Sequence, residues 1–183
     1  MKKRGFGVVK RYEGKNINLP TRQTKSAAGY DFEVAEDFVL PSIWTLNFVR
    51  IFRLIRNGHD LSEKDYELAQ KTLKPLLVPT GIKAYMPENE VLILANRSSN
   101  PLKRGLVLPN GIGVIDADYY NNANNEGEIF VQLINLGVRK VTLKKGERIA
   151  QGIFMPFMTV DDEDEITNDR TGGFGSSGIK GAN

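Results

Sequence analysis

Residues 109–120 read Pro-Asn-Gly-Ile-Gly-Val-Ile-Asp-Ala-Asp-Tyr-Tyr, and this stretch decides how the rest of the chain is interpreted. Two apolar residues, Val114 and Ile115, lead directly into the carboxylate of Asp116. The glycines of the stretch leave the backbone open, so a flat ligand could approach main-chain N–H and C=O groups closely. The pattern predicts a β-hairpin arm, with a return strand from Gly127, that presents Asp116 at its end.

An aspartate at the end of such an arm can serve two kinds of chemistry. It can act as general base for a water molecule, or it can be a metal ligand. The alternative is an ordinary hairpin whose acidic residues only shape the turn. The stretch alone leaves these possibilities open.

The composition predicts a single globular β domain. The chain has 183 residues, 40% of them hydrophobic, with 18 glycines and 8 prolines that imply many turns. It has no cysteine and one histidine, His59, which excludes disulfides, thiolate metal sites and a conventional zinc site. No apolar run has membrane-spanning length and no signal peptide opens the chain, so a cytoplasmic location is expected.

The charge pattern favours a small anionic ligand over nucleic acid. The net charge is +3, and the isoelectric point is near 9.0. The basic residues are scattered, without a patch in which aromatic residues alternate with them. We therefore expect no nucleic-acid partner.

The order Gly-Val-Ile-Asp-x-Asp-Tyr resembles the third signature motif of the homotrimeric dUTP pyrophosphatases (dUTPases). Four other stretches resemble the remaining motifs in the right order: Ala-Gly-Tyr-Asp-Phe at 28–32, Arg-Ser-Ser at 97–99, Gly-x-Arg-Ile-Ala-Gln at 146–151 and Arg-Thr-Gly-Gly-Phe-Gly-Ser-Ser-Gly at 170–178. The resemblance implies an all-β, dUTPase-like distorted jelly-roll barrel with a flexible C-terminal arm. It also implies a homotrimer whose sites are completed by neighbouring chains, and hydrolysis of dUTP to dUMP and pyrophosphate.

The resemblance also assigns roles to individual residues. Asp116 would deprotonate the attacking water, Asp31 would support the site, and Ser98 would help to activate the leaving bond. Mg²⁺ is the implied cofactor, held by the triphosphate and waters, with no direct protein ligand and Asp31 reaching it only through a water. The implied substrate-binding residues are Arg97, Ser98, Ser99, Asn110, Gly113, Val114, Ile115, Tyr119, Phe130, Gln151, Arg170, Phe174, Gly175 and Ser176.

The physical chemistry of these residues agrees with the assigned roles. Residues 90–95 predict a strand buried on both faces, followed by a short helix that is capped by the Ser/Asn run and ends at Gly105. The free N–H groups of such a helix end attract phosphate, and Arg97 adds a planar fork. The ring of Tyr119 would exclude a 2′-hydroxyl, which would be buried there without a partner. Capped helices beside an arginine are also common where no ligand binds.

Residues 42–74 interrupt the family pattern and predict an inserted helical hairpin. Its first helix has an apolar stripe and a stop at Gly58, and its second begins at Ser62. The favoured interpretation is that the apolar face packs on the barrel, and the alternative is a docking surface for a protein partner. Acidic residues on the second helix argue against a membrane-lying role. The stripe consists of Trp44, Phe48, Ile51, Phe52 and Ile55.

Two departures from the pattern qualify the expected site. Residues 121–126, Asn-Asn-Ala-Asn-Asn-Glu, lengthen the connection between Tyr119 and the return strand. Residues 161–165 form an acidic linker, so we expect a β domain over 1–160 and a linker with a lid over 161–183. Two other functions remain open: a relative of the dCTP deaminases, which share the fold, and a regulatory protein-binding module acting through the helical insertion.

Overall fold

The protein is built mainly of short strands, as its many turn residues predict. The structure is a computed structural model and describes residues 2–162. The helices are α1 (Leu46–Arg56), α2 (Glu63–Leu73) and α3 (Ser99–Arg104), with 3-10 turns η1 (Lys10–Tyr12) and η2 (Ala117–Tyr119). The strands are β1 (Gly5–Val8), β2 (Tyr30–Glu33), β3 (Phe38–Leu40), β4 (Leu76–Pro79), β5 (Ile82–Tyr85), β6 (Glu90–Asn96), β7 (Leu106–Val107), β8 (Ile112–Asp116), β9 (Phe130–Asn135), β10 (Val141–Leu143) and β11 (Arg148–Pro156).

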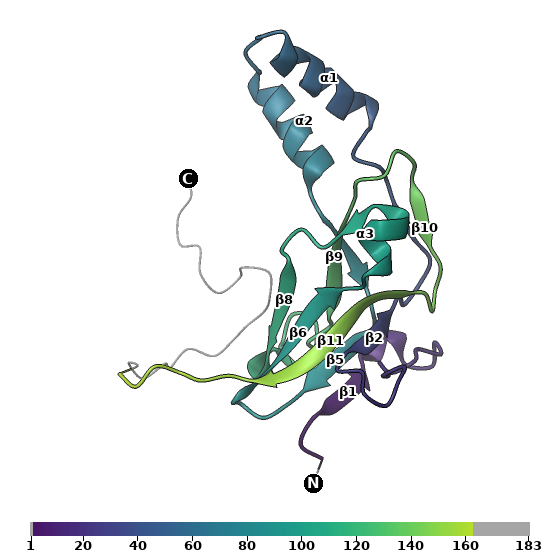
Figure 1. The fold of residues 1–183 in the computed structure, drawn as a ribbon, viewed down its shortest axis with the longest axis vertical. Helices are drawn as coiled ribbons and strands as arrows, with labels where there is room; N and C mark the ends of the chain where they lie inside the picture. The colour runs from purple at the N-terminus through teal and green to yellow at the C-terminus, as the bar shows by residue number, and fades with distance from the viewer. Residues whose placement is uncertain (1, 163–183) are drawn as a thin grey trace.

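The strands form antiparallel sheets around one core (Figure 1). The largest sheet has the order β2-β11-β6-β8, and a second has the order β4-β9-β7. Short pairs, β1-β5 and β10-β3, complete the barrel. Both larger sheets contribute to the core, since Leu92 and Leu94 of β6 share it with Val131 and Leu133 of β9. The predicted all-β barrel is confirmed.

Strand β6 shows which face of the largest sheet turns inward. Leu92 and Leu94 are 0% and 2% exposed, whereas the residues that alternate with them keep part of their surface. The expectation that residues 90–95 are buried on both faces is therefore wrong for a single chain. The outer face is nevertheless apolar, because Val114 of β8, which is 55% exposed, pairs with Ile93 and extends it.

The central motif does not form the predicted hairpin. Strand β8 pairs with β6, while β9, the expected return strand, pairs with β4 and β7. The two strands therefore belong to different sheets, and the segment between them crosses from one sheet to the other. Both stretches form strands as predicted, although the second begins at Phe130 and not at Gly127. A sequence pattern carries no information about which strand pairs with which.

Two helices form within residues 42–74, as predicted. Helix α2 begins with a capping box, in which Ser62 and Asp65 bond each other's backbone N–H groups. Gly58, at φ 69°, follows the end of α1. None of the described helices has the length and apolar content needed to cross a bilayer.

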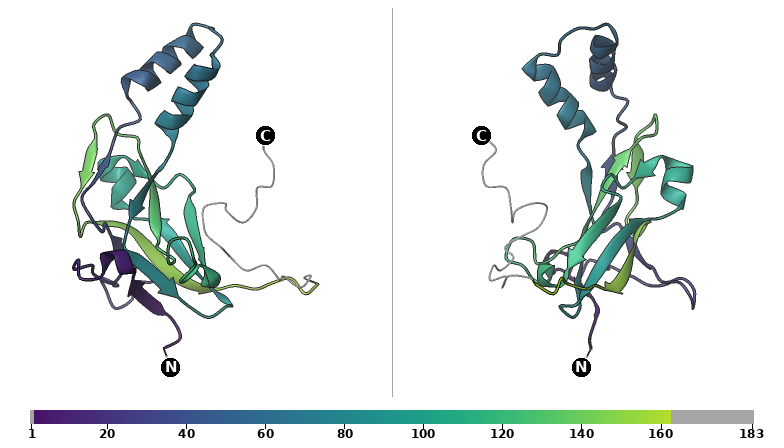
Figure 2. Two further views of the ribbon diagram at one scale, coloured as in Figure 1. Left: turned by 180° about the vertical axis from the view of Figure 1, so that it is seen from behind. Right: turned by 60° about the vertical axis from the view of Figure 1, so that its left-hand side comes forward.

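The prediction that the apolar face of this hairpin packs on the barrel is wrong. The hairpin projects from one end of the barrel (Figures 1 and 2), and its two helices cover each other. Ile51 of the predicted stripe is buried at 4%, but Phe52 and Ile55 are 56% and 58% exposed. The indole Nε1 of Trp44 donates to the carbonyl of Leu136 at 2.9 Å, which fixes the base of the hairpin to the barrel.

Candidate active site

Asp31 on β2 lies between two arginines that come from distant parts of the chain. Its Oδ1 accepts a hydrogen bond from Arg97 Nε at 3.1 Å, and its Oδ2 accepts one from Arg148 Nη1 at 3.1 Å. The Asp31 side chain is 11% exposed, while the Arg97 and Arg148 side chains are 26% and 41% exposed. With two guanidinium groups around one carboxylate, the cluster carries net positive charge and keeps donors facing solvent.

Gln151 joins this cluster because of the strand register. Gln151 is the ladder partner of Asp31, so both side chains leave the same face of the sheet. Its Nε2 donates to the carbonyl of Asn96 at 3.2 Å. The small residue predicted before the Tyr-Asp pair leaves room for this side chain, since a Cβ on Gly29 would lie 2.7 Å from Oε1 of Gln151 and would displace it.

Helix α3 carries the predicted phosphate-binding serines at its start. Ser98 is exposed at the N-cap position, but its side chain makes no capping hydrogen bond, contrary to the expectation. A capping side chain needs an extended backbone, whereas Ser98 has φ −55° and ψ −30°. Asn100 anchors the helix instead, donating to Asn96 Oδ1 at 2.8 Å and to the Ile149 carbonyl at 2.7 Å. The helix ends at Gly105 with φ 65°, as predicted.

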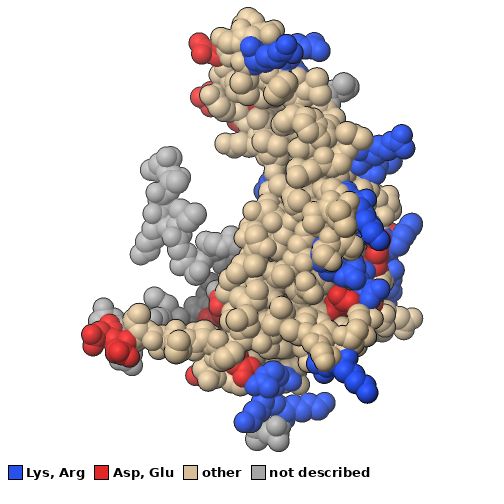
Figure 3. Space-filling model, in the orientation of Figure 1, with Lys and Arg blue, Asp and Glu red and all other residues tan. Residues whose placement is uncertain are grey.

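A surface pocket between α3 and the turn before β11 collects positive charge. Figure 3 shows Lys and Arg side chains gathered on the side of the barrel that carries α3. A pocket with this lining suits an anion with several oxygens. The pocket is lined by Arg97, Ser99, Lys103, Arg104, Gly146, Glu147 and Arg148.

Asp116 is the last residue of β8, the edge strand of the largest sheet. Strand β8 pairs with β6, and within residues 2–162 no strand pairs with its other edge. The main-chain groups of residues 113–115 are thus placed where a flat hydrogen-bonding ligand could pair with them. Asn110 is exposed in the preceding turn, where Gly111 adopts φ 70°.

One chain does not bring Asp116 to the arginine cluster. Asp116 is in register with Val91, and Val91 with Met155, four residues along β11 from Gln151. With about 3.3 Å per residue and about 4.8 Å between strands, the separation of Asp116 and Gln151 is about 16 Å. The two groups lie on the same outer face of the sheet but at opposite ends of it.

Tyr119 and Phe130 lie on either side of the crossing between the sheets. Tyr119 is only 5% exposed, so little of its ring is available to a ligand, and its Oη donates to the Glu128 carbonyl at 2.9 Å. Phe130 is half-buried at the start of β9, and the Arg11 guanidinium lies 5.6 Å from its ring centroid. The N-terminal segment therefore supports the predicted base-binding side of the site.

Glu128 is a buried acid that the sequence did not single out. Its side chain is 2% exposed and forms an ion pair with Arg11 at 2.9 Å. Burial raises the pKa of the Glu128 carboxyl above its ordinary value, and Arg11 and the Gly81 N–H partly offset that rise. The ion pair joins η1 to the segment that follows Tyr119. In the sequence, the feature that could have drawn attention to Glu128 is its position directly after Gly127.

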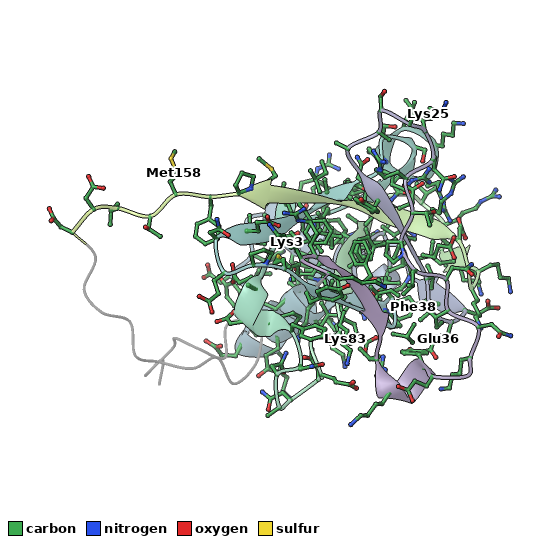
Figure 4. The ribbon with its side chains drawn as sticks, turned by 90° about the horizontal axis from the view of Figure 1, so that it is seen from below. Lys3, Lys25, Glu36, Phe38, Lys83 and Met158 are labelled. Atoms are coloured by element: carbon green, nitrogen blue, oxygen red, sulfur yellow. The ribbon has the colours of Figure 1, made fainter. Side chains whose placement is uncertain are left out.

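The predicted lid residues cannot be placed. Arg170, Phe174, Gly175 and Ser176 lie outside the described residues. The described chain leaves the barrel beyond β11, where Met158 is 96% exposed on a segment that extends from the body (Figure 4).

Comparison with known proteins identifies the family. A dUTPase family model matches residues 55–178. The deoxyuridine 5′-triphosphate nucleotidohydrolase of Lactococcus lactis subsp. lactis (strain IL1403) is 46% identical over 179 residues, covering 97% of this chain and 99% of that protein. The chain belongs to the dUTPase family. The predicted family is thereby confirmed.

Solved dUTPase structures have the same fold. The dUTPase from Streptococcus mutans is 44% identical with a TM-score of 0.66, covering 86% of this chain and 98% of that one. A mutant dUTPase from phage phi11 of S. aureus, in which a structural Mg(II) ion is coordinated, is 17% identical with a TM-score of 0.59. It covers 91% of this chain and 98% of its own, and at that identity the likeness concerns the fold alone.

The donor set fits a magnesium ion that is carried by substrate. Mg²⁺ keeps several waters and commonly binds one or two carboxylates together with substrate phosphates. In the part of the chain that the structure describes, no three His, Asp or Glu side chains gather into a metal site. Both oxygens of Asp31 already accept arginine donors, so their remaining lone pairs suit a metal-bound water better than the metal itself.

Proposed function

We propose that this chain hydrolyses dUTP to dUMP and pyrophosphate, with Asp116 as the general base. The observation that carries the proposal is the convergence of Asp31, Arg97 and Gln151 into one cluster, since these residues come from three separate dUTPase motifs. The names of the close relatives support the same substrate.

The proposed triphosphate site uses the cluster and the start of α3. Arg97, the N–H groups at Ser98 and Ser99, and Gln151 hold the phosphate oxygens. Asp31 orients the Arg97 guanidinium by accepting from its Nε, and the Arg148 carbonyl accepts from its Nη1 at 3.3 Å, so Nη2 is the nitrogen directed to phosphate. The charge that develops on the leaving pyrophosphate is stabilised by these donors and by Arg170.

The nucleoside site uses the crossing between the sheets. The uracil edge pairs with Asn110 and the main chain of residues 113–115, and Phe130 closes the base side. The sugar lies against the small part of Tyr119 that remains exposed, 5% of the residue, where a 2′-hydroxyl would find no partner. The carboxylate of Asp116 takes a proton from a water molecule, which attacks the α-phosphorus in line with the leaving pyrophosphate.

Magnesium fits this scheme as part of the substrate. Asp31 would contact it through a water, and the triphosphate would supply the direct ligands. When bound, the ion supplies positive charge that offsets the negative charge of the phosphates.

We also propose that the active protein is a homotrimer. In one chain Asp116 lies about 16 Å from Gln151, and Asp31 with its arginines lies one strand further away, so a complete site requires a neighbouring chain. The outer face of the largest sheet is suited to that contact: Ile112, Val114 and Met155 are 49%, 55% and 47% exposed. The surface over β6, β8 and β11 carries few charged side chains (Figure 3), as expected of an interface core.

The test is pyrophosphate release from dUTP, UTP, dTTP and dCTP under the same conditions. Release from dUTP alone is expected, and ammonia release from dCTP would instead identify a deaminase. Hydrolysis in ¹⁸O-water should place the label in dUMP, because the water attacks the α-phosphorus. Label in pyrophosphate would contradict the proposed attack.

A second function, protein binding by the helical hairpin, is favoured by the exposure of Phe52 and Ile55. Helix α1 carries Arg50, Arg53 and Arg56 and no acid, so the complementary partner is a protein segment that combines apolar and acidic side chains. An amphipathic peptide with a Glu-rich polar face should bind the wild-type chain, and the same peptide with Lys for Glu should not. Binding should be lost in the Phe52→Ser, Ile55→Ser double variant with dUTP turnover unchanged, and equal binding of both peptides would contradict the role.

A further inference from the structure

The segment that lengthens the connection after Tyr119 is folded tightly against that tyrosine. Gly127 returns at φ 79°, and a Cβ there would lie 2.6 Å from the Tyr119 carbonyl. Asn122 donates from Nδ2 to the same carbonyl at 2.9 Å. Residues 121–126 are thus a structured support for Tyr119, in contrast to the tolerated tip insertion that their composition suggests.

Asn125 bonds the far end of the Tyr119 side chain. Its Nδ2 donates to Tyr119 Oη at 2.7 Å, while that hydroxyl donates its single proton to the Glu128 carbonyl at 2.9 Å. The orientation of the Asn125 amide is determined by its other partners, because Oδ1 accepts from Asn122 Nδ2 at 2.8 Å and from Gly127 N at 3.1 Å. Nδ2 must therefore face the tyrosine.

The support is itself fixed to the barrel. Glu126 accepts from Lys83 Nζ at 2.5 Å and from the Lys10 main-chain N–H at 2.9 Å. Lys83, which is labelled in Figure 4, belongs to β5. Tyr119 is consequently held at its backbone carbonyl and at its hydroxyl by one hydrogen-bonded loop.

We infer that Asn125 is a positioning residue for sugar discrimination, acting through the hydroxyl of Tyr119. The inference rests on the proposed dUTPase function, in which the Tyr119 ring excludes a 2′-hydroxyl. A ring fixed by two hydrogen bonds on Oη cannot yield to make room for that hydroxyl, whereas a ring released at one of them can shift. The proposed scheme gives Asn125 no contact with the substrate, since its side chain bonds Tyr119, Asn122, Gly127 and Glu128.

The experiment compares kcat/KM for dUTP and UTP in the full chain. Asn125→Ala should lower the dUTP/UTP ratio about fivefold, which corresponds to about 1 kcal/mol at 1.4 kcal/mol per tenfold, the contribution of one neutral hydrogen bond. The drop should come from improved use of UTP more than from lost use of dUTP. The matched control is Asn124→Ala, an exposed asparagine of the same loop, for which the ratio should not change.

A double-mutant cycle separates positioning from a purely structural role. In a Tyr119→Phe background the Oη bond is already absent, so Asn125→Ala should change the ratio by less than twofold. Equal effects in both backgrounds, or equal loss of activity toward both nucleotides with an unchanged ratio, would overturn the inference. If Asn125→Ala does not fold, Tyr119→Phe alone must lower the ratio, and an unchanged ratio there also overturns it. A wild-type chain without dUTP turnover would instead overturn the proposed function.

Discussion

Replacing Asp31 by asparagine tests the cluster on which the phosphate site depends. The change removes one charge, keeps the volume, and turns one carboxylate oxygen into a donor that faces an arginine. Hydrogen bonds to charged groups contribute about 1.5–3 kcal/mol when well buried. Asp31 is 11% exposed, but Arg97 and Arg148 are 26% and 41% exposed, so solvent screening reduces each bond to about 1 kcal/mol. We therefore expect a loss of about 2 kcal/mol.

The expected signature is a lower melting temperature. For a chain of this size, 1 kcal/mol corresponds to about 2–4 °C, so Asp31→Asn should melt about 4–8 °C below the wild type. Asp37→Asn is the matched control, because Asp37 pairs with Lys144 at 2.6 Å with both side chains more than half exposed. The control removes the same charge and should leave the melting temperature unchanged within error.

Two results of the melting experiment would contradict the expected role of Asp31. Equal shifts for the two variants would mean that loss of one negative charge, and not the buried pairing, sets the stability. A wild-type melting temperature for Asp31→Asn would mean that the two arginine bonds contribute nothing net. In either case Asp31 could not be the residue that fixes the Arg97 guanidinium.

Three further changes probe other parts of the account. Gly29→Ala should raise the KM for dUTP several-fold without unfolding the chain, because the new Cβ displaces Gln151; an unchanged KM would remove Gln151 from the phosphate site. Arg11→Ala leaves Glu128 buried without its ion pair, and because the Arg11 side chain is 54% exposed, solvent screening lowers the cost of breaking the pair, so urea denaturation should show about 2 kcal/mol lower stability at neutral pH. Because the folded-state pKa of Glu128 is raised, the free energy of unfolding of that variant should fall as pH rises above the ordinary 4.5, and a flat profile would contradict this. Val114→Asp should convert trimers to monomers in sedimentation experiments, and a persistent trimer would place the interface elsewhere.

The sequence predicted the strands and the family well because both depend on local order. The strand predicted over residues 90–95 agrees closely with β6, and the residues of each motif lie close together in the sequence. Local order does not predict that Asp31 and Gln151 lie together, because their proximity depends on the register of β2 against β11. Only the resemblance, and not the composition, placed those residues in one site.

The predictions that proved wrong concern which elements pack or pair with each other, because a sequence pattern does not specify this. The stripe containing Phe52 and Ile55 predicts an apolar neighbour, but the helical period cannot say whether that neighbour is the barrel, α2 or another molecule. The same holds for β8, whose alternation fits a hairpin with β9 and pairing with β6 equally well. The support of Tyr119 by Asn125 was hidden because an Asn-rich run is typical of any exposed turn.

The most direct test of the proposed mechanism is pyrophosphate release by Asp116→Asn, measured beside Asp118→Asn and with dUTP affinity determined separately by calorimetry. Asp118 is an exposed carboxylate two residues away and has no assigned role in the reaction. Asp116→Asn should lose at least about a hundredfold in kcat, the contribution expected of a general base, with the Kd for dUTP nearly unchanged and Asp118→Asn close to the wild type. Turnover retained by Asp116→Asn would contradict the assignment of Asp116 as the base.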